Sequence, residues 1–444
     1  MGYVSRHGRR PAEFASKSAH THVVNDPSVQ EFLAQCSLPK RAEEVSFSDQ
    51  QKLPYEPLPD NPIQHVIAVD GGYQEVAVQT EFPSATLAFF QIGALFFSID
   101  DLEGIDRKPF IDPDDMAKLK NIQHLKFSLP IRNITRKSES TLTDSVRRTL
   151  YDFFRRKTDD GTLMDTLRWF IFREYGTRVP EWTLASCPAC ERASIPLALT
   201  SMSADYKFAC TQCGGEILLT DVFRLHEVID DDLGAGGVLG YVSTSIEQIV
   251  LIHLIRIILK TKPQLMNELL FIKDGPLAFF GQTANLHKPM RDLVRFLFDR
   301  HNLYLAGLEK SGAFVEHADE IARRLEPGTI LLLDNDYIYK YIIPGKADPA
   351  NPYGRTTYYS SKLIFKTLAS GMHVVSLPTV DVTPNPTPDD LRNLQAILTN
   401  IEKLKCDMYD NALVPVALAN KLVSLANHPS SRILQKFAIG TAFH

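Results

Sequence analysis

Two stretches of the sequence decide the fold, HVIAVDGG at residues 65–72 and LLFIKDGP at residues 269–276. Each is a short apolar run, typical of a buried strand, that leads into an Asp-Gly pair containing Asp70 or Asp274. Open α/β sheets place ligand-binding groups at the carboxyl ends of their strands, and the glycine lets the backbone turn and a ligand approach. Asp-Gly is also a common turn signal, so for each pair both interpretations stay open.

The chain between and after these stretches alternates between strand and helix patterns. The order of these elements predicts an α/β protein built on a partly parallel sheet. Beyond residue 244 we expect helices over 245–260, 288–300, 314–324, 388–405 and 414–427, and strands over 269–273, 304–308, 329–333, 358–365 and 373–377. Upstream, we expect helices near 28–36 and 140–156 and a strand-rich region over 86–99.

Composition limits the classes of function. The 444 residues are 44% hydrophobic and 23% charged, which is typical of a globular protein with a full core. The formal net charge is -5, so any contact with DNA must come from a local basic patch rather than from bulk charge. We expect no membrane-spanning segment, because the most apolar run, 246–259, is interrupted by polar and charged residues. No secretory signal is recognisable, and a cytoplasmic location is expected.

Four of the six cysteines form two close pairs, with the spacing C-x2-C-x19-C-x2-C. The pairs are Cys187 with Cys190 and Cys210 with Cys213. Two such knuckles can close one tetrahedron of thiolates around Zn²⁺. Because protein sulfur fills all four positions, the pattern predicts a structural zinc ribbon rather than a catalytic metal site.

Glu247 is a third carboxylate of interest. Helical spacing places it on the same stripe as apolar residues that should pack on the sheet, where a buried acid needs a partner such as a cation. Thr244 and Glu247 also fit a capping box, in which the glutamate bonds back to the helix start, and both interpretations stay open. Glu268 is a weaker candidate, and Asp334 and Asp336 are expected to cap a turn.

The order of three motifs resembles that of the NurA nuclease family: VDGG at 69–72, KDGPL at 273–277 and GLEKSG at 307–312. The resemblance covers about residues 63–100 and 240–444. It implies an RNase H-like mixed sheet flanked by helices and DNA cleavage that depends on Mn²⁺ or Mg²⁺. It further implies a homodimer that works with a HerA-type hexameric ATPase in DNA-end processing or anti-phage defence.

The resemblance also implies the roles of individual residues. Asp70 and Asp274 match the two motif aspartates, Glu247 is the best match to the family glutamate, and Lys310 resembles the motif lysine. Two cations bridged by Asp70 would then activate water for phosphodiester hydrolysis, with Lys310 near a phosphate oxygen. The sequence departs from the family at Glu309 and Ser311, which flank this lysine, and at Asn420, where a histidine is expected.

These observations together predict three parts of the chain. Residues 1–62 would form an N-terminal arm and a proline-rich linker, and residues 63–100 with 240–444 the nuclease domain. Residues 101–239 would be an insertion that contains the zinc ribbon at about 183–220 and a helical segment.

Two groups of residues are candidates for DNA binding, although each also fits an ordinary helix face or strand. They are Arg147 and Arg148 on one predicted helix, and the mixed basic and aromatic set Arg355, Tyr358, Tyr359 and Lys362. An alternative function is a non-catalytic adaptor that binds DNA or an ATPase through the zinc ribbon and basic patches. A phosphotransferase with a phosphate turn at 69–72 is disfavoured, since no second glycine-rich phosphate loop accompanies it, and no P-loop is present.

Overall fold

The computed structural model describes residues 23–36, 40–79, 84–103, 120–406, 412–425 and 430–442. The predicted arm over residues 1–22 therefore lies outside the described residues. The chain divides into two units, Met1–Val45 and Ser46–His444. In the first unit α2 (Pro27–Gln35) begins at Asp26, whose side chain accepts a hydrogen bond from the Ser28 amide.

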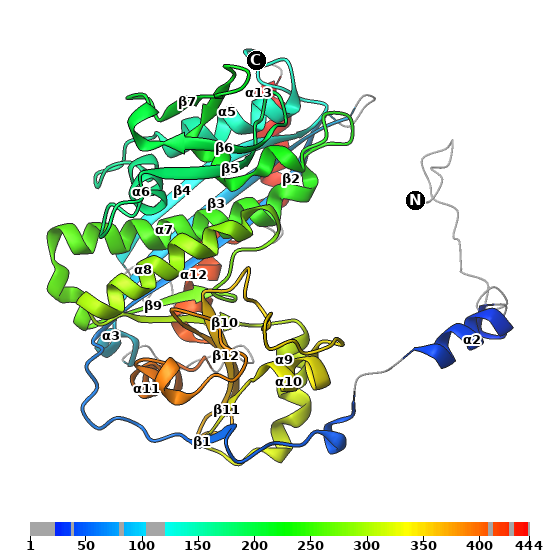
Figure 1. Ribbon diagram of the computed structural model, residues 1–444, viewed down its shortest axis with the longest axis vertical. Coiled ribbons are helices and arrows are strands. Elements are labelled where there is room, and N and C mark those ends of the chain that lie inside the picture. Colours follow the sequence, from blue (N-terminus) through cyan, green and yellow to red (C-terminus); the bar gives the residue numbers. More distant parts are fainter. Residues whose placement is uncertain are drawn as a thin grey trace. The chain divides into compact units, whose positions relative to one another are not determined.

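The second unit is built on a nine-stranded mixed sheet (Figure 1). Its order is β1-β11-β12-β13-β10-β9-β2-β3-β4. Strands β9, β10 and β2 pair in parallel, and the other neighbours are antiparallel. The strands are β1 (Lys52–Pro54), β2 (His65–Gln79), β3 (Ala85–Ser98), β4 (Lys120–Arg132), β9 (Leu269–Asp274), β10 (Tyr304–Glu309), β11 (Thr329–Leu332), β12 (Ser360–Lys366) and β13 (Met372–Pro378).

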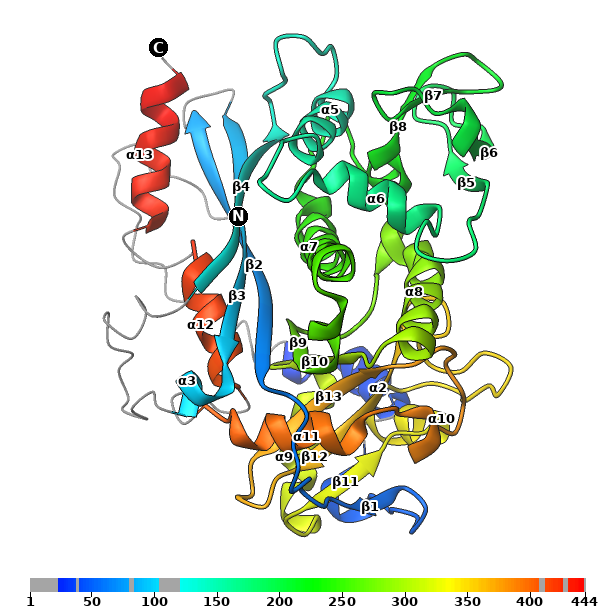
Figure 2. The same cartoon turned by 90° about the vertical axis from the view of Figure 1, so that its left-hand side faces the viewer.

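Helices cover both faces of this sheet. Figure 2 shows α12 and α13 on one side of β2, β3 and β4, with α7 on the other. The helices of this unit are α3 (Ile99–Glu103), α5 (Leu142–Phe154), α6 (Leu163–Ile171), α7 (Leu239–Thr261), α8 (His287–Arg300), α9 (Ala313–Ile321), α10 (Asn335–Tyr337), α11 (Leu394–Lys403), α12 (Val414–Val423) and α13 (Ser430–Ala442). The predicted α/β class with a partly parallel sheet is confirmed.

Strand alternation separates two hydrophobic cores. Val69 and Phe271 face the core that contains α5, α6, α7 and α8, whereas Ala68 and Ile272 face the core that contains α11 and α12. Helix α7 is apolar on nearly all sides because the sheet covers one side and α6 packs against another. A 26-residue segment that includes α7 is long and apolar enough to cross a membrane, but 72% of its most apolar window is buried inside the protein. Core packing accounts for that composition.

Strand β2 is longer than expected. The sequence predicted that it ends at Asp70, but the strand continues for 15 residues, to Gln79. Gly71 and Gly72 remain extended because side chains from α7 and the backbone of α12 approach them from opposite faces. Asp70 therefore lies within a strand rather than at a turn, and the phosphate-turn interpretation of residues 69–72 is wrong. Strand β9 does end at Asp274, where Gly275 turns the chain with φ of +83°.

The segment predicted as an insertion is part of the main unit. Strand β4, within the predicted range 101–239, forms the edge of the large sheet beside β3. The ribbon strands are β5 (Glu181–Ser186), β6 (Ala193–Ala198), β7 (Lys207–Ala209) and β8 (Glu216–Leu218). Their buried residues, such as Leu184 and Ile217, belong to the same hydrophobic core as α5, α6 and α7.

The proline-rich segment 54–62 does not act as a free linker. Tyr55 is buried and its ring meets Phe365 edge-on, and Ile63 is buried in the same core. The Leu58 amide donates to Thr399 Oγ1. The boundary between the two units accordingly falls at Val45, not at residue 62.

Candidate active site

The pairing of β2 with β9 brings the two motif aspartates together. Val69 and Lys273 are register partners in this parallel pair, so Asp70 and Asp274 each follow the same rung. Neighbouring strands lie about 4.8 Å apart, and strand alternation places both side chains on the same side of the sheet. Two residues 204 positions apart in sequence thus become neighbours.

Both aspartates open into one cleft of about 380 Å³. Strands β2, β9 and β10 supply its floor, and α7 and the turns after β9 and β10 supply its walls. We call this the carboxylate cleft. Its lining residues are Asp70, Gly71, Thr244, Glu247, Lys273, Asp274, Gly275, Pro276, Phe280, Glu309, Lys310 and Ser311. All four residues predicted to be catalytic, Asp70, Glu247, Asp274 and Lys310, are among them.

Asp70 is the most unusual carboxylate of the cleft. It is 4% exposed, its Oδ1 accepts a hydrogen bond from the Gly71 amide at 2.8 Å, and its buried Oδ2 has no hydrogen-bond partner. Burial, followed by the negative charges of Asp274 and Glu247, raises the pKa of Asp70 to about 8. A buried acceptor without a partner marks a place where a cation or a proton is needed.

Glu247 lies in the middle of α7, one helical turn beyond Ser243. Its Oε2 is 2.9 Å from Lys273 Nζ and its Oε1 accepts a hydrogen bond from Ser243 Oγ at 3.2 Å. The capping-box interpretation is wrong, because α7 begins at Leu239, eight residues before Glu247. Burial raises the pKa of Glu247, while the ammonium group of Lys273 opposes that rise.

Gly71 makes the approach of α7 possible. A Cβ atom at this position would lie 2.6 Å from Glu247 Oε1. The glycine of the VDGG motif is therefore required for the contact between strand and helix rather than for a turn.

The cleft also contains residues that the sequence analysis did not single out as site residues. Lys273 is buried and pairs with Glu247, and Glu309 pairs with Lys362 at 2.6 Å. Lys310 Nζ lies 2.7 Å from Asp274 Oδ2 at the mouth of the cleft. Only the position of Lys273, directly before Asp274 in the apolar strand, offered a signal, since a buried lysine in a strand needs a carboxylate partner.

This arrangement suits a hard divalent cation. Mg²⁺ and Mn²⁺ prefer carboxylate oxygens, and three carboxylates from β2, α7 and β9 converge here. The orphaned Oδ2 of Asp70 meets the requirement that the donor set be incomplete without an ion. Asp70, Glu247 and Asp274 are the residues that could hold such a cation.

The four paired cysteines form a second candidate metal centre. The sulfur atoms of Cys187, Cys190, Cys210 and Cys213 all lie within 4.8 Å of one another, and Cys187 Sγ is 3.9 Å from Cys213 Sγ. A tetrahedron with Zn–S bonds of about 2.3 Å has sulfur atoms about 3.8 Å apart, so the group could bind zinc.

Backbone amides support these sulfur atoms. The amides of Ala189, Gln212 and Gly215 donate to Cys187, Cys210 and Cys213 respectively. The turn after Cys213 uses Gly214 with φ of +73°, as the two glycines of the motif predicted.

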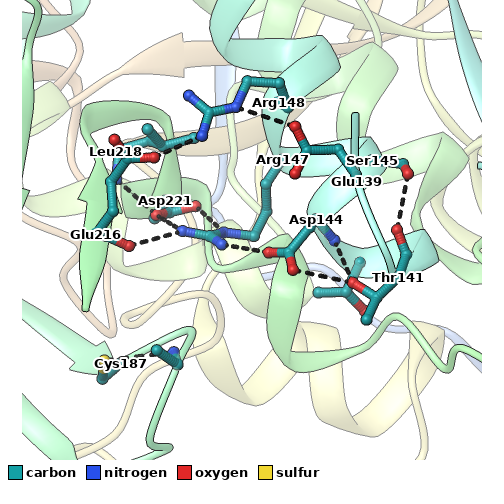
Figure 3. Close-up of polar contacts among 12 residues, drawn as sticks. Glu139, Thr141, Asp144, Ser145, Arg147, Arg148, Cys187, Glu216, Leu218 and Asp221 are labelled. Atoms are coloured by element: carbon teal, nitrogen blue, oxygen red, sulfur yellow. Dashed lines mark hydrogen bonds and ion pairs between the residues drawn. The ribbon is translucent and has the colours of Figure 1, made fainter. Parts of the chain in front are cut away.

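Arg147 and Arg148 are held within the protein rather than offered to a ligand (Figure 3). Arg147 is 12% exposed and lies between Asp144 and Asp221, at 2.6 and 2.9 Å. Arg148 pairs with Glu216 on β8 at 2.5 Å. These contacts join α5 to the zinc ribbon, so the prediction that the two arginines bind DNA is not supported by their surroundings.

The second predicted DNA-binding group is largely buried. Tyr359 is fully buried and donates its hydroxyl to Gln248, and Tyr358 is 6% exposed. Lys362 is 5% exposed and its ammonium lies 3.6 Å from the Phe314 ring centroid. Stacking on bases by these two tyrosines is therefore wrong for this conformation, and of the group only Arg355 is exposed.

The remaining sequence candidates lie elsewhere. Asp334 caps the turn that follows β11, because its Oδ1 accepts from the Tyr337 amide at 2.7 Å. Glu268 precedes β9, and Asn420 is exposed on α12; neither lines the carboxylate cleft.

Comparison with known proteins adds one solved structure. No protein-family model and no curated protein matches the sequence. The chain is similar to the NurA nuclease from Sulfolobus solfataricus with a TM-score of 0.34 and 8% identity, over 97% of this chain and 98% of that chain. A likeness at this level assigns neither fold family nor activity.

Proposed function

We propose that the protein is a divalent-metal-dependent nuclease that hydrolyses DNA phosphodiesters in the carboxylate cleft. The observation that carries the proposal is the convergence of Asp70, Asp274 and Glu247, from three separate elements, around an aspartate oxygen that has no partner. The order of the three sequence motifs that supply Asp70, Asp274 and Lys310 supports the same proposal.

The proposed fold family is RNase H-like. In support, β4, β3 and β2 form an antiparallel group beside the parallel strands β9 and β10, and the carboxylates lie on the adjacent central strands β2 and β9. The position of α7 against these strands gives the third carboxylate.

The residues of the cleft have distinct tasks in this proposal. A bound Mg²⁺ or Mn²⁺ ion supplies an activated water and polarises a phosphoryl oxygen. Asp70, Asp274 and Glu247 hold the ion. Lys310, 28% exposed at the mouth, offers its ammonium group to a phosphate oxygen of the substrate. Lys273 keeps Glu247 oriented toward the cleft.

The partners in this proposal are DNA, a second copy of the chain and a HerA-type hexameric ATPase in DNA-end processing or anti-phage defence. A separate ATPase is needed for translocation because the sequence carries no P-loop. Zn²⁺ in the ribbon has a structural task, and the setting is cytoplasmic.

The test is digestion of end-labelled single- and double-stranded DNA with Mn²⁺, by the wild type and by Asp70→Asn and Asp274→Asn. Both substitutions should abolish cleavage while the far-UV circular dichroism stays unchanged. Asp381→Asn is the matched control, because Asp381 is 77% exposed and outside the cleft. DNA binding that survives all substitutions, with no cleavage by the wild type, would favour the adaptor alternative instead.

A further inference from the structure

The carboxylate cleft contains built-in positive charges. Three of its four carboxylates each face a lysine ammonium group: Glu247 and Lys273 at 2.9 Å, Asp274 and Lys310 at 2.7 Å, and Glu309 and Lys362 at 2.6 Å. The fourth, Asp70, has an unpartnered buried oxygen. Such pairs reduce the positive charge that the cleft can accept from solvent.

Each candidate ligand also has one oxygen already engaged. Asp70 Oδ1 accepts the Gly71 amide, Glu247 Oε2 faces Lys273, and Asp274 Oδ2 faces Lys310. Asp70 Oδ2, Glu247 Oε1 and Asp274 Oδ1 remain, one from each carboxylate. Asp70 cannot bridge two cations through both of its oxygens while the Gly71 amide holds one of them.

We propose that the cleft takes a single divalent cation, and that Lys273 and Lys310 supply the positive charge that a second cation would otherwise bring. The inference rests on the proposed function and replaces its expected pair of cations with one. Four carboxylates and three ammonium groups leave one negative charge when all are ionised. One divalent cation and one phosphodiester then bring the cleft to neutrality, whereas two cations would leave an excess of two positive charges at a largely buried site.

Lys273 is the positioning residue in this arrangement. Its side chain is 3% exposed and its Nζ also donates to the Asp274 carbonyl oxygen, so the ammonium group has no route to solvent when a cation enters. Lys310 is at the mouth and can turn toward a phosphate oxygen. The two lysines therefore divide the work, one fixed beside Glu247 and one facing the substrate.

The experiment is the stoichiometry of Mn²⁺ binding to the zinc-loaded full chain, measured by titration calorimetry and by electron paramagnetic resonance of free Mn²⁺. The wild type should bind one ion per chain, and Asp70→Asn should bind none in the same concentration range. Lys273→Met should bind two, because Glu247 then has both oxygens and no internal counter-charge. Lys421→Met, an exposed lysine outside the cleft, should bind one.

The outcomes separate this inference from the proposed function. Two ions per wild-type chain would overturn the single-cation inference and leave the nuclease proposal standing, whereas no binding would overturn both. One ion in both the wild type and a folded Lys273→Met chain would overturn the role given to Lys273. If Lys273→Met does not fold, Lys310→Met provides the same comparison at the exposed end of the cleft, with the same expected rise to two.

Discussion

At the scale of single residues, Asp70 holds the most consequential proton of the molecule. Burial and two neighbouring carboxylates raise its pKa to about 8, whereas an aspartate in an unfolded chain titrates near pH 4. In this window the folded chain keeps a proton that the unfolded chain has released. The free energy of unfolding therefore falls as the pH rises from about 4 to about 8.

Asp70→Asn tests this pH dependence, because asparagine resembles the protonated aspartate in shape and charge. We expect the wild type to lose stability relative to Asp70→Asn as the pH is raised from 5.5 to 8 in buffer free of Mg²⁺ and Mn²⁺. Urea unfolding at several pH values measures the difference. Asp381→Asn should follow the wild type in parallel, and a constant difference between Asp70→Asn and wild type would contradict the shifted pKa.

Adjacent glycines on β2 show how a residue's face decides its effect, which belongs to the scale of elements. A Cβ atom on Gly71 would lie 2.6 Å from Glu247 Oε1 on α7, whereas one on Gly72 would lie 2.7 Å from the Val423 backbone oxygen on α12. The two substitutions to alanine are chemically identical and differ only in the helix that they displace.

Gly71→Ala should leave the chain folded, because a flexible carboxylate can move aside, but should weaken Mn²⁺ binding about 10–100-fold by displacing Glu247. Gly72→Ala should instead lower the free energy of unfolding by about 1–3 kcal/mol, because a helix backbone must shift. Titration calorimetry and urea unfolding of both variants make the comparison. Equal effects of both substitutions on cation affinity would contradict the assigned faces.

The zinc ribbon is the second element with a testable role. Its buried Cys187 and Cys210 lie in the same hydrophobic core as α5, α6 and α7, and Arg147 ties α5 to the strand β8. Binding of a structural zinc contributes directly to folding free energy, so Cys210→Ser should lose the metal and lower the melting temperature. Metal analysis and thermal unfolding check this, with Cys36→Ser, an exposed cysteine outside the ribbon, as the control. A zinc-free variant with unchanged melting temperature would show that the ribbon is dispensable for the core.

At the scale of the whole molecule, the sequence predicted local patterns better than long-range pairing. Apolar runs located β2, β9 and β10, and cysteine spacing located the knuckles, because both signals are contained in a few residues. The extension of β2 past Gly71, the burial of Tyr359 and the pairing of Arg147 with Asp221 depend on segments distant in sequence. A basic or aromatic residue alone does not reveal whether a carboxylate or a helix will cover it.

The boundary between the two units gives the prediction for the whole chain. Deleting residues 1–45 removes only the first unit and should leave the melting temperature and Mn²⁺-dependent cleavage unchanged. Deleting residues 1–62 also removes β1, which pairs with β11, and Tyr55, whose burial contributes about 1.5–3 kcal/mol. The longer deletion should therefore melt at a lower temperature than the shorter one, as measured by scanning calorimetry. Tyr55→Ala in the full chain should reproduce part of that loss, and two deletions of equal stability would restore the linker interpretation of residues 54–62.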